Sequence, residues 1–445
     1  MDILGLIPSF GNILYTIGAF VLALSVIVAV HEFGHYIVGR WSGIHAEVFS
    51  LGFGPVLLSR EDRHGTRWQL AALPFGGYVK FMGDANAASG IDPQLLRDLD
   101  EDTLRHTMHG APLWARAATV AAGPVFNFAL SIAVFAAVLF FRGEAIEPPT
   151  IGTLKTLPAE AMELRPGDEI TAIGGRPVSD YAALYKAISD LPPTPVVDYA
   201  VRRDGQEMVV QGPYPFPPVI DALQPGSAAM DAGLKVGDVI LSVDGQPVTA
   251  FRQLQDIVRN SGGAEMLVRV WREGQEMEFS LAPRRVDMPL PEGGFETRLL
   301  IGMNGGLLFT PETRTPGALT AVEAGAQQVV FIIRSSLSGL YHMVTGAISS
   351  CNISGPLGIA ETSGAMASQG TQSFIWFIAV LSTAVGLMNL FPIPVLDGGH
   401  LVFHAYEAVF GKPPSARALS VFMSLGLAVI LTFMIFALGN DILCP

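Results

Sequence analysis

The 445-residue sequence is poor in charged residues and in cysteine. Only 15% of its residues are charged, whereas a soluble protein carries about 25%. Half of the residues are hydrophobic, which several membrane spans beside a soluble part would explain. Two cysteines, Cys351 and Cys444, exclude a disulfide framework and a cysteine-rich zinc site. They could still pair with each other if both face an oxidising compartment.

The sequence also lacks an excess of basic residues. Its formal net charge is −13, which argues against nucleic-acid binding, because that function requires a basic face. The first apolar run has no basic segment before it and no small-residue cleavage site after it. We therefore expect no separable signal peptide.

Four long uncharged runs stand out, at residues 13–30, 117–141, 371–396 and 418–440. Each is close to the roughly 20 residues that a helix needs to cross a bilayer. Basic residues follow the first run, from Arg40 to Arg116, and lie between the last two, at Lys412 and Arg417. Since basic loops stay on the cytoplasmic side, both termini and segment 143–370 should lie outside.

The outer segment contains an internal repeat. Leu164–Ile170 is echoed by Leu234–Ile240, and Arg203–Met208 is echoed by Arg272–Met277, in each case roughly 70 residues later. Alternating apolar residues followed by Gly-rich pairs predict strands and tight turns. We predict five regions: a membrane part with the inner loop, two similar β-rich domains, a linker with a surface helix, and a second membrane part, at residues 1–142, 143–216, 217–286, 287–370 and 371–445.

Within the predicted linker region, Ala318–Val344 has a helical pattern. Arg334 and His342 interrupt its apolar residues. This pattern predicts a helix on the membrane surface rather than a fifth span.

The end of the first apolar run carries a metal-binding pattern. His31 and His35 are four residues apart, so a helix places both imidazoles on one face, where they can share a metal ion. Glu32 is offset around the helix and can reach a water bound to that metal. Zinc lowers the pKa of such a water to about 7, so that a carboxylate can take its proton. The alternative is a helix end with interfacial polar residues, but ionisable residues at membrane depth are costly and usually functional.

A catalytic zinc ion needs a third protein ligand, and Asp397 is the best candidate. Pro392 and Pro394 should break the third span just before it. Irregular backbone at membrane depth is tolerated only where it is buried in protein or lines a cavity, so the break directs Asp397 inward. The alternatives are that Asp397 caps the following helix, or that His400 or His404 is the ligand.

These motifs resemble those of the site-2 protease family of intramembrane metalloproteases. The resemblance covers essentially the whole chain and rests on His31–His35, on the late Leu-Asp-Gly segment, and on Ala122–Phe128 with its Gly-x-x-x-Asn pattern. Gly52–Pro55 and Pro74–Lys80 in the inner loop also match. The two outer repeats look like PDZ domains.

The resemblance implies a role for each motif residue. His31, His35 and Asp397 would ligate Zn²⁺, and Glu32 would be the general base. Asn389 would hold the substrate backbone or the developing oxyanion. Residues 76–81 would form a β-hairpin that dips into the membrane and pairs with an unwound substrate strand, although an ordinary loop element is the alternative. The implied substrate-binding residues are Asn389, Gly76, Gly77, Tyr78 and Asn127.

The implied fold is a polytopic α-helical membrane protein with four transmembrane helices and two β-rich PDZ-like domains inserted between the second and third helices. The implied location is the bacterial inner membrane, with both termini and the PDZ-like domains periplasmic and the active site toward the cytoplasm. Implied substrates are single-span membrane proteins: an anti-sigma factor of the envelope-stress response after a first cut, and remnant signal peptides. The PDZ-like pair would filter substrates by size or bind peptides, with a groove near Val219–Leu223.

Two other functions are compatible with part of the pattern. A membrane scaffold with an inactive metal site predicts a missing base or ligand, but Glu32 is present. A transporter that uses His, Glu and Asp as a proton relay would need more spans and a membrane repeat, and neither is evident.

Overall fold

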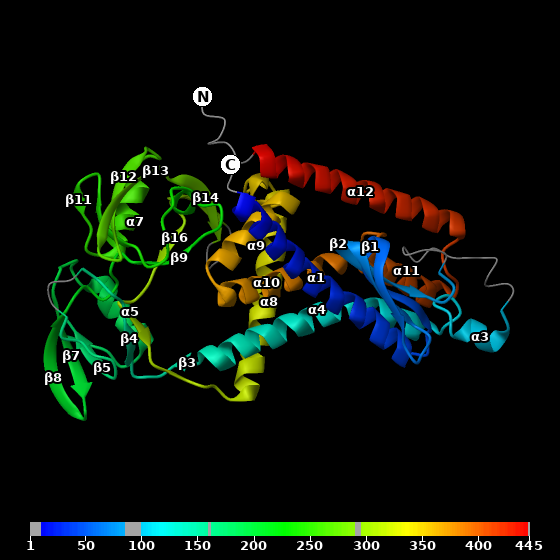
Figure 1. Ribbon diagram of the computed structural model, residues 1–445, viewed down its shortest axis with the longest axis horizontal. Coiled ribbons are helices and arrows are strands. Elements are labelled where there is room, and N and C mark those ends of the chain that lie inside the picture. The colour runs from blue at the N-terminus through cyan, green and yellow to red at the C-terminus, as the bar shows by residue number, and fades with distance from the viewer. Residues whose placement is uncertain (1–9, 85–98, 159–161, 290–294, 444–445) are drawn as a thin grey trace. The chain divides into compact units, whose positions relative to one another are not determined.

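The computed structural model describes residues 10–84, 99–158, 162–289 and 295–443. The chain forms two compact units (Figure 1). The first consists of residues 1–138, 319–344 and 350–445, and the second of residues 139–318 and 345–349. Cys351 is not a free thiol, and the other cysteine, Cys444, lies outside the described residues.

The first unit is built from helices and one β-hairpin. Its elements are α1 (Phe10–Trp41), β1 (Ala46–Glu61), β2 (Arg67–Phe81), α3 (Glu101–Arg105), α4 (Leu113–Arg142), α8 (Ala318–Val344), a 3₁₀ turn (Ser350–Asn352), α9 (Pro356–Ser368), α10 (Thr371–Asn389), α11 (Asp397–Phe410) and α12 (Ala416–Leu443). Within the described residues, α1, α4, α10 and α12 are long and apolar enough to cross a membrane. A long apolar helix is therefore present at each of the four predicted spans.

The third apolar run forms a shorter helix than predicted, whereas the predicted surface helix forms over its full range. α10 covers the third apolar run only as far as Asn389, because Pro392 and Pro394 follow and proline cannot continue a helix. The chain then turns and re-enters a helix at Asp397, the first residue of α11. α8 forms over the predicted surface-helix range.

Glycine lets the spans approach one another closely. A Cβ at Gly34 of α1 would lie 2.6 Å from the carbonyl oxygen of Ala122 on α4, and one at Gly386 of α10 would lie 3.2 Å from Asn127 Cβ. Small residues at such crossings bring helix backbones together in membranes. The metal motif on α1 is thereby held directly against α4.

The hairpin folds back on itself into a wider sheet. Within β1, Val48–Leu51 pairs with Gly77–Lys80 on one side and with Arg67–Leu70 on the other. The end of β1, residues 58–61, also pairs with Arg67–Leu70, so that Arg67–Leu70 lies between two parts of β1. The last part of β2, Gly77–Phe81, therefore has a strand on one side only, among the residues that the structure describes.

Asp62 ties the turn of the hairpin to α1. Its carboxylate accepts hydrogen bonds from Trp68 Nε1 at 3.0 Å, from Tyr36 Oη at 3.2 Å, and from the backbone N–H groups of His64 and Thr66. Partial burial raises the pKa of Asp62, but these hydrogen bonds outweigh it and lower the pKa to about 2. The carboxylate is thus charged at neutral pH, which keeps the hairpin anchored.

The second unit contains the predicted repeat. Its elements are β3 (Glu144–Ala145), β4 (Ile151–Leu154), β5 (Glu169–Ile173), β6 (Arg176–Pro177), α5 (Tyr181–Asp190), β7 (Val197–Arg203), β8 (Gln206–Gly212), β9 (Ile220–Leu223), α6 (Ala228–Asp231), β10 (Val239–Val243), β11 (Gln246–Pro247), α7 (Phe251–Asn260), β12 (Met266–Arg272), β13 (Gln275–Leu281), β14 (Arg284–Pro289), β15 (Phe295–Leu300), β16 (Met303–Gly305), β17 (Phe309–Pro311) and β18 (Thr313–Arg314). The sheets β6-β5-β7-β8 and β11-β10-β12-β13 have the same order, as the repeat predicts.

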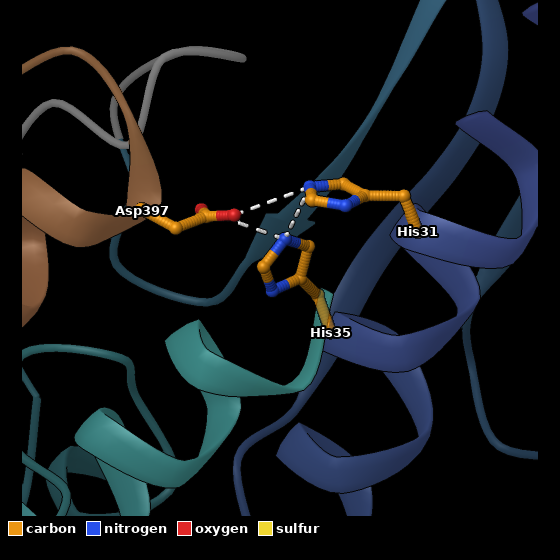
Figure 2. A group of neighbouring side chains, drawn as sticks. All are labelled: His31, His35 and Asp397. Carbon is orange, nitrogen blue, oxygen red and sulfur yellow. Dashed lines mark hydrogen bonds and ion pairs between the residues drawn. The ribbon is translucent and has the colours of Figure 1, made fainter. Parts of the chain in front are cut away.

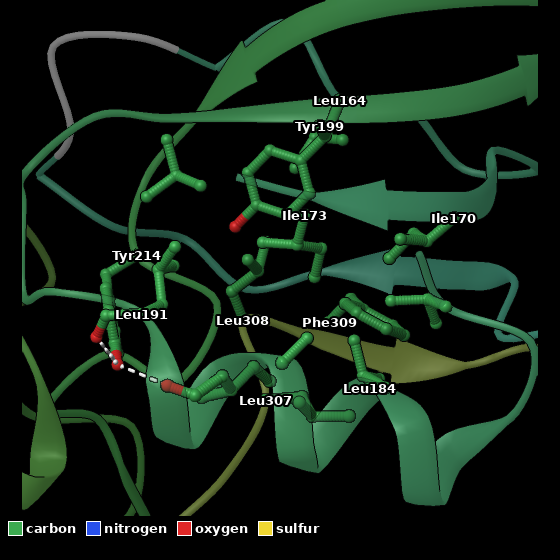
Figure 3. Close-up of a cluster of buried hydrophobic side chains, with 14 of the residues drawn as sticks. Leu164, Ile170, Ile173, Leu184, Leu191, Tyr199, Tyr214, Leu307, Leu308 and Phe309 are labelled. Carbon is green, nitrogen blue, oxygen red and sulfur yellow. Dashed lines mark hydrogen bonds between the residues drawn. The ribbon is translucent and has the colours of Figure 1, made fainter. Parts of the chain in front are cut away.

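Each repeat is completed by a strand that lies beyond residue 286. β16 pairs with β9 of the second repeat, and β17 pairs with β4 of the first. The buried cluster of the first repeat accordingly includes Leu307, Leu308 and Phe309 beside Tyr199 and Tyr214 (Figure 3). The chain thus returns to the first repeat after it has formed the second.

The Arg and Asp residues of the repeated sequence form the same ion pair twice. Arg203 donates two hydrogen bonds to Asp168, at 2.6 and 2.7 Å, and Arg272 does the same to Asp238 at 2.6 and 2.7 Å. Each carboxylate is almost fully buried. Each also accepts a backbone N–H three residues before it, so that it fixes the turn that leads into the first strand of its sheet.

Removing either carboxylate should destabilise the repeat that contains it. Asp168→Ala or Asp238→Ala leaves an arginine unpaired and should lower the local free energy of unfolding by about 3 kcal/mol. Amide hydrogen exchange of the full chain in detergent would show faster exchange in the corresponding sheet. The control is Asp256→Ala, whose pair with Arg259 is exposed and should contribute under about 0.5 kcal/mol. Equal effects of Asp256→Ala and Asp238→Ala would contradict this account.

Candidate active site

α1 presents two imidazoles on one face. His31 and His35 lie on successive turns, and their Nε2 atoms are 3.2 Å apart (Figure 2). Asp397, at the start of α11, approaches from the opposite side. Its Oδ2 lies 3.2 Å from His31 Nε2, and its Oδ1 lies 3.6 Å from His35 Nε2.

The spacing of these atoms fits a tetrahedral metal site. Zinc bonds nitrogen and oxygen ligands at about 2.0–2.1 Å, so two ligands of a tetrahedral ion lie about 3.3 Å apart. The three separations are close to that value. Asp397 Oδ2 is also buried and has no hydrogen-bond donor among the described residues, which a bound cation would explain. Among those residues, these three side chains form the one group of His, Cys, Asp and Glu found with the proximity that a shared metal requires.

α4 holds the rear nitrogens of both imidazoles. His35 Nδ1 lies 2.8 Å from the carbonyl oxygen of Thr119, and His31 Nδ1 lies 3.2 Å from Asn127 Nδ2. Metal-binding histidines usually have such a partner on the second ring nitrogen, which fixes the tautomer and the orientation of the ring. Each imidazole is therefore oriented with Nε2 toward Asp397.

Gly123 brings α4 against the same imidazoles. A Cβ at this position would lie 2.4 Å from His35 Nε2 and 2.7 Å from His31 Cε1. Real Cβ atoms do not approach other atoms so closely, so no larger residue fits without displacing the histidines. Gly123 and Asn127 are four residues apart and therefore share one face of α4, the face that meets the metal motif.

A cavity of about 330 Å³ opens at the three side chains. Its lining includes Glu32 from α1, Asn389 from the end of α10, and Gly77, Tyr78 and Val79 from the one-sided strand of the hairpin. A metal ion, a carboxylate base and a strand with an open edge would therefore face one space.

The sequence also matches a known protein family. The sequence profile of peptidase family M50 matches residues 19–433. The chain belongs to peptidase family M50. It is a zinc metalloprotease of the site-2 type and a membrane protein.

Relatives of this M50 peptidase match along nearly their whole length. A predicted zinc metalloprotease of Rhizobium meliloti is 38% identical over 434 residues, which are 97% of this chain and 97% of that protein. The regulator of sigma-E protease RseP of Salmonella typhimurium is 33% identical over 462 residues, covering 97% of this chain and 99% of that protein.

The residues predicted to bind substrate in this peptidase lie in two places. Asn389, Gly77 and Tyr78 line the cavity, and Gly76 adjoins them in β2, where its positive φ of 147° suits glycine. A Cβ at Gly77 would lie 2.7 Å from Ser50 O and 3.2 Å from Glu32 Cγ, so glycine lets the strand approach the base. Asn127, by contrast, is fully buried against His31.

The rival ligands of the M50 site also lie near it. His400 and His404 line the cavity but do not belong to the group of side chains that lie close enough together to share a metal ion. Sequence reasoning did not find Thr119, because a backbone carbonyl leaves no trace in the sequence. It also gave Gly123 no role, although the Gly-x-x-x-Asn spacing places Gly123 and Asn127 on one helix face.

Proposed function

We propose that this M50 peptidase cleaves single-span membrane proteins with a zinc ion held by His31, His35 and Asp397. The observation that carries the proposal is the convergence of the three ligand atoms at tetrahedral spacing, beside Glu32 in one cavity. When bound, zinc supplies a Lewis acid that polarises the peptide carbonyl and acidifies water. Every other task falls to the residues of the chain.

Glu32 is the proposed general base. It follows the first ligand on α1 and lines the same cavity, so its carboxylate can accept a proton from the attacking water and deliver it to the leaving amine. Asn389, at the end of α10 and far from Glu32 in the sequence, lines the same cavity. Its amide can hold the substrate backbone or donate to the developing oxyanion.

Asn127 is better suited to orient His31 than to bind substrate. A neutral imidazole that offers Nε2 to a metal carries its proton on Nδ1 and therefore needs an acceptor there. The Asn127 amide has its nitrogen toward His31 Nδ1, while its buried Oδ1 has no partner among the described residues. A half-turn of the amide places Oδ1 against Nδ1–H, which satisfies both groups.

The one-sided strand Gly77–Phe81 is the proposed docking edge for substrate. A helical substrate must unwind before its peptide bonds are accessible, and an unwound segment needs partners for its backbone groups. An open strand edge supplies those partners by β-addition. Because Gly77, Tyr78 and Val79 line the cavity with Glu32, a peptide paired there would lie beside the proposed metal and base.

The proposed substrates are an anti-sigma factor after a first cut on its outer side, and remnant signal peptides. The named activity of the Salmonella relative, regulation of sigma-E, supports the first of these. The proposed location is the bacterial inner membrane, with both termini and the repeats in the periplasm and the cavity toward the cytoplasm. The distribution of Arg and Lys between the loops supports that orientation.

The two repeats are proposed to be PDZ-like domains that filter substrates by size, with peptide binding as the alternative. Val219, Ile220 and Leu223 are buried, and β9 is paired on its edge by β16, so residues 219–223 do not offer the predicted groove. A groove of about 230 Å³ lies instead between α7 and residues 299–304. That groove is the place to test for peptide binding.

The third ligand can be tested against its rival. Asp397→Ala should abolish stoichiometric zinc binding and cleavage of a single-span substrate, because two histidines alone hold zinc weakly. His400→Ala, which alters the same cavity without touching the ligand group, should keep its zinc. The measurements are zinc content of the purified chain and cleavage in detergent. Retention of zinc by Asp397→Ala, with loss in His400→Ala, would refute the proposed ligand set.

A further inference from the structure

The position of Asp397 depends on how α11 is held. Asp397 is the first residue of this helix, and the segment before it, residues 390–396, consists of turns rather than a helix or strand. Only Gly398 and Gly399 of α11 are fully buried. The rest of the helix must therefore be fixed by contacts further along, since a rigid helix transmits its tilt to its first residue.

On the side toward α12, Phe403 of α11 meets Phe422 of α12, but an open pocket borders much of the rest of that face. A cavity of about 680 Å³ lies there, with Val402, Phe403 and Tyr406 of α11 and Phe422 of α12 in its lining. The helix therefore has room to shift in that direction unless something holds it from the other side.

Arg116 at the start of α4 provides that hold. Its Nη1 and Nη2 donate to Glu407 Oε2 and Oε1 at 3.0 and 2.7 Å, and its Nε donates to Ala111 O at 3.0 Å. Both side chains of the pair are largely buried, at 15% and 17% exposed. A bidentate Arg–carboxylate pair fixes direction as well as distance, and these hydrogen bonds keep the pKa of Glu407 below its ordinary value.

Glu407 lies ten residues after Asp397, which is about 15 Å along the helix. The ion pair therefore acts at the far end of α11 from the ligand. α4 also contacts the other two ligands, through Thr119 at His35 and through Asn127 at His31. The positions of all three proposed ligands thus depend on contacts with α4.

We infer that Arg116 and Glu407 are positioning residues that set the place of Asp397, and hence the affinity of the site for zinc, by fixing α11 to α4. The inference rests on the proposed zinc ligands. Arg116 lines the same cavity as the proposed ligands, but its hydrogen bonds go to Ala111 and Glu407, so both residues act through the helix. Outer residues that orient metal ligands typically contribute about 10- to 100-fold in metal affinity.

The test measures zinc affinity of the full chain in detergent by competition with a chelating dye. Arg116→Gln and Glu407→Gln should each weaken zinc binding about 10-fold. The double variant should bind zinc no more weakly than either single variant, because each single change already breaks the same ion pair. Excess zinc should restore most of the cleavage rate. The control is Glu144→Gln, which breaks the exposed pair of Glu144 with Arg314 and should leave zinc affinity unchanged.

Zinc affinity equal to that of the unaltered chain in both single variants would overturn the inference. So would additive losses in the double variant. If Glu407→Gln does not fold, Glu407→Asp keeps the charge but shortens the reach, and it should weaken zinc binding in the same direction. Asp397→Ala separates this inference from the proposed function: if that variant binds zinc normally, the ligand set fails; if only the Arg116 and Glu407 variants bind normally, the positioning role alone fails.

Discussion

Glu32→Gln is expected to abolish cleavage while the chain keeps its zinc. Gln has nearly the shape of Glu but cannot accept the proton of the attacking water, so the rate should fall by about 100- to 10,000-fold. Glu32 is not among the three proposed ligand side chains, and so the metal should stay. The measurements are cleavage of a single-span substrate and zinc content of the same preparation.

The matched control for this change is Glu361→Gln on α9, which removes the charge of an exposed carboxylate. It should cleave at the rate of the unaltered chain. Cleavage at full rate by Glu32→Gln with zinc bound would eliminate Glu32 as the base. Loss of zinc from Glu32→Gln would instead give the carboxylate a part in holding the metal.

Gly123→Ala should be as damaging as the loss of a ligand, although it adds a single methyl group. The added Cβ would lie 2.4 Å from His35 Nε2, so either the imidazole leaves its position or α4 moves away from α1. Both outcomes disturb the metal site, and zinc affinity should fall by about 100-fold or more. Dye competition and the cleavage assay would measure the two effects.

Gly18→Ala on α1 is the control, because a Cβ there meets no atom within 4 Å. It changes a glycine of an apolar span without crowding any neighbour and should preserve both zinc and activity. If Gly123→Ala also preserved zinc binding and activity, the close approach of α4 to the imidazoles would not be required for function.

Much of the site could be predicted because its chemistry is local. The four-residue spacing of His31 and His35 determines a shared helix face, and the geometry agrees. Asp397 is distant in sequence, but the prolines before it mark a broken span, and breaks at membrane depth point to cavities. The spans were predictable because the length and apolar character of a membrane helix appear directly in the sequence.

Long-range pairings could not be predicted. The strands that complete the two repeats, β16 and β17, lie beyond residue 286, and a strand of three residues carries too little pattern to name its partner. The contacts of α4 with the ligands depend on a backbone carbonyl at Thr119 and on the missing side chain of Gly123. Neither gives a signal in a single sequence, because each matters only once the two helices meet.

The short pairing of β3 with β18 has a consequence for how such a protein can evolve. Thr313 pairs with Ala145, and Arg314 pairs with Glu144, so the two ends of the segment that contains both repeats, residues 144–314, lie side by side. An insertion whose ends lie side by side can be lengthened, duplicated or lost without moving the ends of the host helices that flank it. The two repeats themselves look like the product of such a duplication. A lineage could thus exchange the two repeats while the sequence that builds the candidate metal site stays unchanged.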